Sequence, residues 1–262
     1  MSYIGKNYSD FEILASTSLE YKTIWEYQNF IEFHPEVKQI VPSHDVNKNF
    51  KLLTILNKQY PEIEFELMVN EGCLQGCPHR MLHEMVYFDV KTIINNDLNL
   101  SGAYPALFCS QVLSKYPFHS LFIGTHIYPW EISEYAKIGI KNFKLVGRDG
   151  YQSNMNYYIN SFRLYLKEIE GNNTGEKYPV SDLIHHLLGS HIIQQIYKEE
   201  AKKYLPNIKH FKKYGHLCAS RCGVECRYCY KCAEKIQKVF EKKVKKSEKK
   251  FRYVPACKIA TG

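Results

Sequence analysis

The sequence has no long hydrophobic run. None of its apolar stretches reaches the ~18 residues that a helix needs to cross a bilayer. The first residues, MSYIGKNYSD, are polar and do not resemble a secretory signal peptide. The mean hydropathy is -0.38. We therefore expect a protein that makes no membrane contact and resides in the cytoplasm.

Motifs of hydrolytic enzymes are missing as well. No G-x-S-x-G occurs, and the sequence His-Glu-Met at His83 lacks the second histidine of a zinc protease. A hydrolase needs a nucleophile with a base, or an open zinc site with a general base. The sequence therefore gives no direct support for proteolysis. It also has no internal repeat of the solenoid type.

The composition is that of a folded protein with a basic end. The chain has 262 residues and is 45% hydrophobic, which is enough for a core and excludes disorder or a collagen-like structure for most of it. The net charge of +8 is concentrated between Lys235 and Lys250, and the rest is nearly balanced. This segment could bind nucleic acid. Because Glu234, Glu241 and Glu248 interrupt the lysines, a solvated helix of mixed charge is the favoured interpretation.

Apolar runs alternate with amphipathic segments along the first half of the chain, which is typical of strands and helices in a parallel α/β sheet. We expect strands at 11–16, 37–42, 65–70, within 120–129, and at 142–148. Helices are expected at 19–33, capped by the Ser16 to Ser18 cluster, and from Asp45 through Leu56. A third helix should begin near Pro129 and stop at Gly139.

These elements predict four segments. Residues 1–150 would form a partial (β/α) barrel of the TIM type, 151–210 a helical region, 211–235 a Cys-rich metal-binding segment and 236–262 a basic tail. A closed barrel needs eight strands, and about five are found. We therefore expect an open sheet, a chain that lacks an N-terminal part of the barrel, or a partner chain or second copy that completes it.

Polar and thiol side chains follow the third expected strand. They are Asn70, Glu71, Cys73, Cys77, Arg80 and His83. We take Asn70 and Glu71 as candidates for binding the cofactor. The carboxyl end of a strand is where parallel α/β folds bind ligands. Two thiolates with three residues between them can reach one iron or zinc centre, and the intervening glycines let the backbone curl around it. The alternative is that both cysteines are small buried hydrophobic residues in a Gly-rich turn.

Cationic groups lie near the same predicted edge. Arg80 and His83 could contact an anionic substrate or a cluster sulfur. Lys144 and Arg148 lie on or just beyond the last expected strand, where a cation could hold a carboxylate or phosphate. We take these four residues as candidates for a catalytic role, either by binding the substrate or by supporting the metal ligands.

A family resemblance rests on two segments. NEGCLQGCPHRMLHE resembles the signature of the collagenase-like "U thirty-two" peptidase family, and THIYPWEISEYAKIGIKNFKLVGRDG resembles a later block of that family. The resemblance covers about residues 11 to 150. Here Trp130 stands between Pro129 and Glu131, and Tyr128 replaces the usual arginine, so a role of that arginine is not supported.

The resemblance implies a redox function despite the family name. Several members are similar to oxygen-independent hydroxylases of RNA bases or quinone precursors, with a 4Fe-4S cluster on four cysteines near the barrel mouth. By this similarity Cys73, Cys77 and Cys109 match ligand positions. Family members also carry three further strand units before the equivalent of residues 11–16.

A dense cysteine cluster lies near the C-terminus, at Cys218, Cys222, Cys226, Cys229 and Cys232. Packing gives no reason for five thiols at these intervals, so the cluster indicates metal. Cys222, Cys226 and Cys229 have the C-x3-C-x2-C spacing of radical S-adenosylmethionine enzymes, but in those enzymes a barrel follows the motif. Two interpretations remain open: completion of an iron-sulfur site with the barrel cysteines, or a separate zinc or second-cluster knuckle.

The sequence therefore predicts an iron-sulfur enzyme that transfers electrons or activates a small acidic cosubstrate. Its substrate would be a small-molecule metabolite or an RNA base. The first alternative is a non-catalytic zinc or iron-sulfur scaffold subunit, and the second is a peptidase.

Overall fold

The computed structural model describes residues 11–69, 75–81, 126–145, 204–218 and 221–247, with residues 7, 159, 160, 162, 163, 166, 167 and 170. The chain divides into two compact units. The first comprises Met1–Gly76, Gly124–Pro179 and Pro206–Arg227, and the second comprises Cys77–Ile123, Val180–Leu205 and Tyr228–Gly262. The expected division into four segments stays a prediction.

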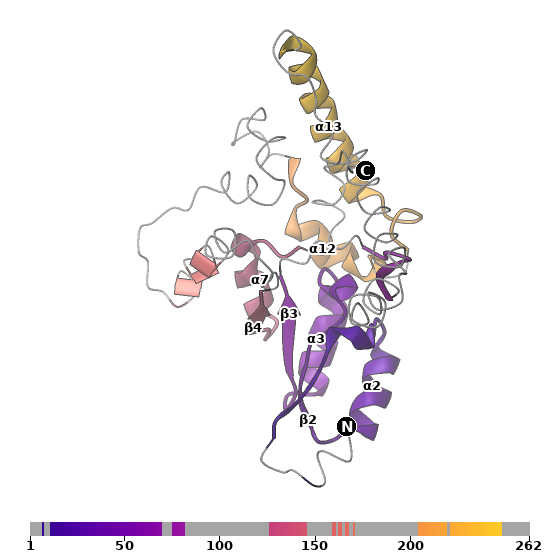
Figure 1. Cartoon of the computed structure of the whole chain (residues 1–262), viewed down its shortest axis with the longest axis vertical. Helices are drawn as coiled ribbons and strands as arrows, with labels where there is room; N and C mark the ends of the chain where they lie inside the picture. Colours follow the sequence, from indigo (N-terminus) through magenta and orange to yellow (C-terminus); the bar gives the residue numbers. More distant parts are fainter. Residues whose placement is uncertain are drawn as a thin grey trace, which may run out of the picture. The chain divides into compact units, whose positions relative to one another are not determined.

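A parallel four-stranded sheet forms the centre of the first unit (Figure 1). Its strands are β1 (Ile13–Ala15), β2 (Val37–Ile40), β3 (Glu64–Met68) and β4 (Asn142–Lys144), paired in that order. All three pairings are parallel, which confirms the expected α/β class. The further strand expected within 120–129 falls mostly outside the described residues, and β4 pairs directly with β3.

The first long helix begins later than predicted. α2 spans Ile24–Phe33, and Thr23 caps it: its hydroxyl accepts the Glu26 N–H at 3.3 Å, while the Glu26 carboxylate accepts the Thr23 N–H at 2.8 Å. This capping box satisfies two backbone donors at the helix start. The expected cap at Ser16 instead begins a short 3-10 helix, η1 (Thr17–Leu19).

The second helix is also shorter than expected. α3 spans Phe50–Gln59, and Asn49 caps it by accepting the Leu52 N–H at 3.1 Å. The residues from which the helix was expected to start form a separate 3-10 helix, η2 (His44–Val46). An Asn side chain competes for backbone donors and so favours a helix boundary over a helix interior.

The third helix matches the prediction. Pro129 begins the 3-10 helix η3 (Pro129–Glu131), and α7 (Ile132–Ala136) continues it. Gly139 follows with φ of 89°, in the left-handed region where glycine carries no Cβ penalty. An added Cβ there would lie 2.0 Å from the Asn57 side chain.

The described helices α2, α3 and α7 pack on the same face of the sheet. Tyr27 of α2 meets Phe65 of β3 with ring centroids 6.4 Å apart, and Tyr135 of α7 meets Phe143 of β4 at 6.3 Å. Phe50 of α3 packs on the Tyr135 ring at 4.6 Å. Phe65 and Phe143 point to one face, because Phe143 is paired with the residue two positions after Phe65. This face carries the apolar core.

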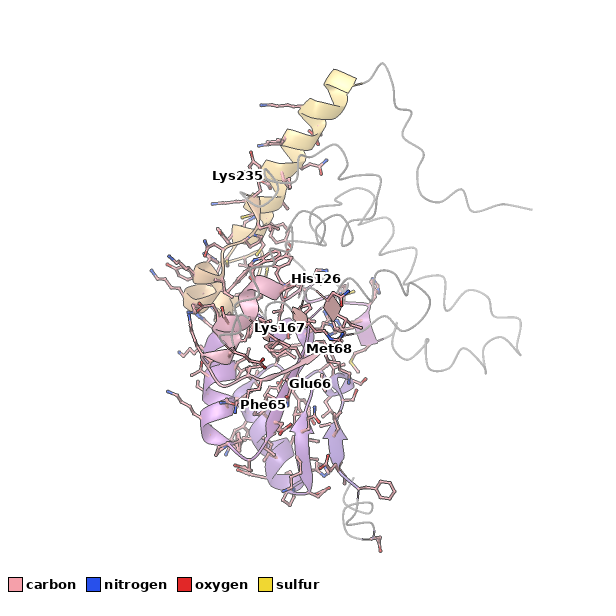
Figure 2. The ribbon with its side chains drawn as sticks, turned by 90° about the vertical axis from the view of Figure 1, so that its left-hand side faces the viewer. Phe65, Glu66, Met68, His126, Lys167 and Lys235 are labelled. Atoms are coloured by element: carbon pink, nitrogen blue, oxygen red, sulfur yellow. The ribbon has the colours of Figure 1, made fainter. Side chains whose placement is uncertain are left out.

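The opposite face of the sheet is polar. Asn142 donates to the Glu64 carboxylate at 2.8 Å, and Lys144 lies 3.7 Å from the Glu66 carboxylate. Figure 2 labels Glu66 between Phe65 and Met68 on β3. The sheet therefore has one apolar face under helices and one face that carries paired polar side chains.

Three further elements follow in the C-terminal part. α12 (Ile208–Tyr214) leads into the 3-10 helix η4 (Gly215–Leu217), and α13 spans Tyr228–Ser247. α13 is amphipathic and continues past the boundary expected at 235. Among the residues of α13 whose burial is described, Cys232, Ala233 and Ile236 are buried, and the exposed lysines include Lys231, Lys235, Lys238 and Lys242. None of the helices within the described ranges has the length and apolar character for crossing a bilayer. The expected helical region 151–210 lies largely outside those ranges.

Candidate functional site

The segment at 43–49, directly after β2, is polar and yet buried. Its buried polar residues are Ser43, His44, Asp45, Asn47, Lys48 and Asn49. The carboxyl ends of parallel strands meet at one edge of the sheet, and ligands bind there in α/β folds. Burying so many polar groups is unfavourable unless each is paired. The contacts of this segment therefore define the candidate site.

Asn47 fixes the segment against the sheet. Its side-chain amide donates to the carbonyl of Met68, the last residue of β3, at 2.7 Å. Its own carbonyl accepts the Tyr135 hydroxyl of α7, also at 2.7 Å. These two bonds join three elements that are distant in sequence, so residues 43–49 are held rigidly at the edge.

Asp45 is a buried carboxylate that organises the start of the cysteine motif. Its side chain lies 2.8 Å from the Lys22 ammonium and accepts the Gly76 N–H at 2.9 Å. Its carbonyl accepts the Gln75 side-chain amide at 2.7 Å. The turn that directly precedes Cys77 in the chain is thus tied to the end of β2.

Lys48 and Glu131 form a buried ion pair. The ammonium lies 2.6 Å from the carboxylate, and both side chains are at most 5% exposed. The same carboxylate oxygen accepts the Tyr128 N–H at 3.0 Å. The ammonium also lies 5.0 Å from the Phe211 ring and 5.5 Å from the Tyr128 ring. The faces of aromatic rings attract a cation at these distances, so the two rings help to stabilise the buried ammonium of Lys48.

His126, labelled in Figure 2, lies just beyond the carboxyl end of β3, where the N–H of the following Ile127 donates to the Val69 carbonyl at 2.9 Å. Burial lowers the pKa of its imidazole to about 4, and the positive charge of Lys48 acts in the same direction. His126 is therefore neutral at physiological pH. Its Nδ1 has no hydrogen-bond partner within the part of the chain that the structure describes.

Three cysteines of the C-terminal cluster belong to this first unit. The pKa of the Cys218 thiol is raised to about 12, mainly by burial and in smaller part by the nearby Cys222 and Cys226. Burial and charge on Cys226 likewise raise the pKa of Cys222. A negative charge on one of these thiols would therefore make it harder to ionise the others. A bound cation would remove the penalty of ionising them together.

A tight turn brings two of these cysteines side by side. Cys222 and Cys226 are paired as an isolated parallel bridge, and the Gly223 N–H donates to the Cys226 carbonyl at 2.8 Å. Gly223 has φ of 86°, which glycine adopts without strain. Arg221 and Glu225 form an ion pair across the same turn. The C-G-x-x-C sequence thus folds as a compact knuckle.

His210 is a residue of this cluster that the sequence analysis missed. Its Nε2 lies 3.3 Å from the Cys226 sulfur. Partial burial lowers the pKa of His210, which keeps the imidazole neutral. The residue lies 16 positions before Cys226, a separation that gives no local signal. A search for histidines just upstream of the cysteines could have identified it.

The Cys-rich segment docks on the polar edge of the sheet. Gly215 packs so closely that an added Cβ would lie 1.7 Å from the Lys48 carbonyl oxygen. The Gln75 side chain, which binds the Asp45 carbonyl, also donates to the Cys218 carbonyl at 3.2 Å. Within the first unit, therefore, the chain before Cys77 and the chain around Cys218 share a hydrogen-bonding side chain.

The second unit holds four further predicted residues. Arg80 is 3% exposed, and its N–H donates to the Cys77 carbonyl at 3.3 Å. Cys77 and Cys229 are half-buried thiols. Cys232 is buried on α13, where burial raises its thiol pKa.

The remaining predicted site residues divide into two groups. Lys144 is the last residue of β4, at the carboxyl end of the strand as expected, and lies beside Glu66. Asn70, Glu71, Cys73, His83, Cys109 and Arg148 lie outside the described residues. Among the residues that are described, no three His, Cys, Asp or Glu side chains converge closely enough to hold a metal ion between them.

We found no protein-family model, no curated protein and no solved structure that matches this chain.

Proposed function

We propose that this protein is an iron-sulfur enzyme with a partial (β/α) barrel, similar to the "U thirty-two" peptidase-like proteins that carry out redox chemistry. One observation carries the proposal. Gln75 donates to the carbonyls of both Asp45 and Cys218, and so joins the carboxyl edge of the sheet to the C-terminal cysteines. Sites of catalysis in parallel α/β enzymes lie at that edge.

The arrangement of helices supports a barrel. In a (β/α) barrel the helices form an outer ring, whereas in a doubly wound sheet they cover both faces. The described helices α2, α3 and α7 share one face, and the opposite face is polar. A further strand unit, a partner chain or a second copy would complete the ring. The proposed location is the cytoplasm.

The donor atoms present suit iron or zinc. Thiolates are the ligands of iron-sulfur clusters, and zinc takes thiolate and imidazole together. When bound, a cluster supplies or accepts single electrons. We propose Cys73, Cys77 and Cys109 as ligands, together with members of the C-terminal cluster. The ion pair of Lys48 with Glu131 holds the edge rigid, so that the site keeps its shape.

The proposed substrate is a small molecule or an RNA base. Arg80, His83, Lys144 and Arg148 supply cationic groups for an anionic part of it. Lys144 is one-third exposed, so it can be reached from solvent. His126, held neutral, provides a hydrogen-bonding nitrogen that carries no charge.

The experiment measures iron, zinc and acid-labile sulfide, with a visible spectrum, on protein purified without oxygen. Iron and sulfide in near-equal amounts would support the proposal. Cys73→Ala and Cys218→Ala should lower iron content and visible absorbance. Cys257 stands alone near the C-terminus, outside both groups of cysteines, so Cys257→Ala should change neither. Equal loss of metal in all three variants would contradict the assignment of ligands.

A second candidate is a zinc-stabilised scaffold without catalytic activity. The compact turn between Cys222 and Cys226 favours it, because zinc knuckles use short chelating loops of this kind. Zinc without iron or sulfide in the same measurement would select this candidate.

A further inference from the structure

We propose that the helix α13 binds the phosphate backbone of a nucleic acid through a stripe of four exposed lysines. The four residues are Lys231, Lys235, Lys238 and Lys242. This inference goes beyond the proposed function, because binding of this kind needs neither a metal centre nor a catalytic step.

The helix separates charges that are interspersed in the sequence. The four lysines follow one another at intervals of four, three and four residues, which places them within about 60° of one another around a helix axis. Glu234 and Glu241 are seven residues apart and lie together on one flank, about 70–90° from the centre of the lysine stripe. The glutamates therefore interrupt the lysines only in the order of the sequence, and one side of the folded helix is basic.

The lysine charges are accessible to a ligand. All four side chains are exposed, and Figure 2 labels Lys235 on the helix. Within the part of the chain that the structure describes, none of the four ammonium groups forms an ion pair. Glu241 instead accepts a hydrogen bond from the Gln237 side chain at 3.0 Å. Among the described residues, therefore, no carboxylate neutralises the stripe by direct contact.

The apolar side of α13 is buried inside the protein. Cys232, Ala233 and Ile236 are at most 8% exposed. A basic helix that lies on a membrane inserts its apolar side into the lipid, and a helix that enters a hydrophobic groove of another protein buries the same side. That side of α13 is already covered, so the lysine stripe acts through charge alone.

The exposed side of α13 lacks the residues that protein interfaces use. Between 231 and 242, every exposed side chain that the structure describes is a lysine or a glutamate. Protein interfaces are depleted in both residue types and enriched in aromatic residues, methionine and arginine. Lysine binds phosphate as a point charge. The composition of this surface therefore favours a chain of phosphates over an acidic protein.

The length of the stripe suits the charge spacing of a nucleic acid. From Lys231 to Lys242 the helix rises about 16 Å, at about 1.5 Å per residue. A DNA strand carries one phosphate per about 3.4 Å of duplex axis, so about five phosphates of one strand fall within that length. Each lysine therefore has a phosphate within reach.

The test measures binding by the full-length protein, purified without oxygen, of a fluorescein-labelled single-stranded RNA and of a DNA duplex of the same sequence. Fluorescence anisotropy is recorded between about 50 and 200 mM salt. The test variant combines Lys231→Gln, Lys235→Gln, Lys238→Gln and Lys242→Gln. We expect its affinity to fall at least about tenfold at the lowest salt concentration. The slope of log affinity against log salt should become shallower by about 3, because each phosphate contact contributes about 0.7–0.9.

The matched control removes the same charge elsewhere. It combines Lys38→Gln, Lys51→Gln, Lys58→Gln and Lys141→Gln, four exposed lysines of the first unit, and should bind as the unmutated protein does. A second variant with arginine at all four stripe positions keeps the charge and should keep the affinity. Circular dichroism checks that α13 remains helical in each protein.

The outcomes separate this inference from the proposed function. Failure to bind either nucleic acid, an equal loss of affinity in the two glutamine variants, or binding to phosphatidylserine vesicles in place of nucleic acid would overturn it. The ratio of the RNA and DNA affinities identifies which nucleic acid the helix holds. Iron, zinc and sulfide content should be the same in the test variant and the unmutated protein. Loss of this inference therefore leaves the metal centre standing, and nucleic-acid binding by a protein without metal would overturn only the proposed function.

Discussion

The ammonium of Lys48 lies 2.6 Å from the carboxylate of Glu131, although 83 positions separate the two residues in the chain. Both side chains are buried, and they join the segment after β2 to the helix that precedes β4. A buried charge that loses its partner is strongly destabilising, because the remaining charge stays desolvated.

Removal of one member of this pair should therefore strongly destabilise the folded protein. We expect Lys48→Met to lower the free energy of unfolding by about 3–5 kcal/mol. The double variant Lys48→Met with Glu131→Leu should lose less than the sum of the two single changes, since it leaves no unpaired charge. Urea unfolding measures all of them. Lys137→Met, which removes an exposed partner of Glu134, is the control and should change stability by less than about 1 kcal/mol. Additive effects at positions 48 and 131 would contradict the pairing.

His126 should make stability fall as the pH is lowered. Its folded-state pKa is about 4 against an ordinary value of 6.5, so the unfolded chain takes up the proton first. The stabilisation is complete above pH 6.5 and is lost between there and pH 4, by about 3 kcal/mol in all. His126→Gln has no imidazole and therefore lacks this pH-dependent stabilisation. The difference in unfolding free energy between the unmutated protein and His126→Gln should shrink as the pH is lowered. Parallel pH profiles would show that His126 titrates normally.

Gly215→Ala should displace the Cys-rich segment from the sheet edge. Its Cβ would meet the Lys48 carbonyl oxygen at 1.7 Å, and backbone atoms cannot yield as a side chain can. We expect a loss of at least about 2 kcal/mol and a lower metal content. Gly76→Ala is the comparison, because its Cβ meets nothing within 4 Å and carries only the strain of φ at 61°, about 1 kcal/mol. Similar losses in both variants would argue against close packing at Gly215.

Thr23→Ala should weaken α2. The change removes the hydroxyl that accepts the Glu26 N–H, which we expect to cost about 1 kcal/mol in urea unfolding. Ser16→Ala removes an exposed 3.3 Å bond to the Ser18 N–H at the short η1 and should cost less. If Ser16→Ala proved the more damaging of the two, the helix start would have to be moved back toward the residues first expected to cap it.

The strands were predictable because the signal for each is local. Short apolar runs gave the positions of β1, β2, β3 and β4, and Pro129 with Gly139 gave the third helix. The predicted start of α2 was wrong, because the cluster from Ser16 to Ser18 was taken as the helix cap in place of Thr23. The T-x-x-E pattern formed with Glu26 was nevertheless readable in the sequence.

For the candidate site, the spacing of Cys218, Cys222 and Cys226 indicated a metal cluster, which stays a prediction. The structure places Cys222 beside Cys226 in one turn. The role of Lys48 was not predictable, because its partner Glu131 lies 83 positions away in the chain. The approach of His210 to Cys226 had only one signal in the sequence, a histidine upstream of the cysteines.

The pairing of β3 with β4 leaves a long connection, from Val69 to Lys141, between two adjacent strands. The entropy lost in closing such a loop grows only with the logarithm of its length, so that each doubling costs about 0.6 kcal/mol. Parts of this connection are fixed by contacts, because Gln75 and Gly76 bind Asp45 and Glu131 pairs with Lys48. Changes of length that keep these contacts should therefore leave the register of β4 intact.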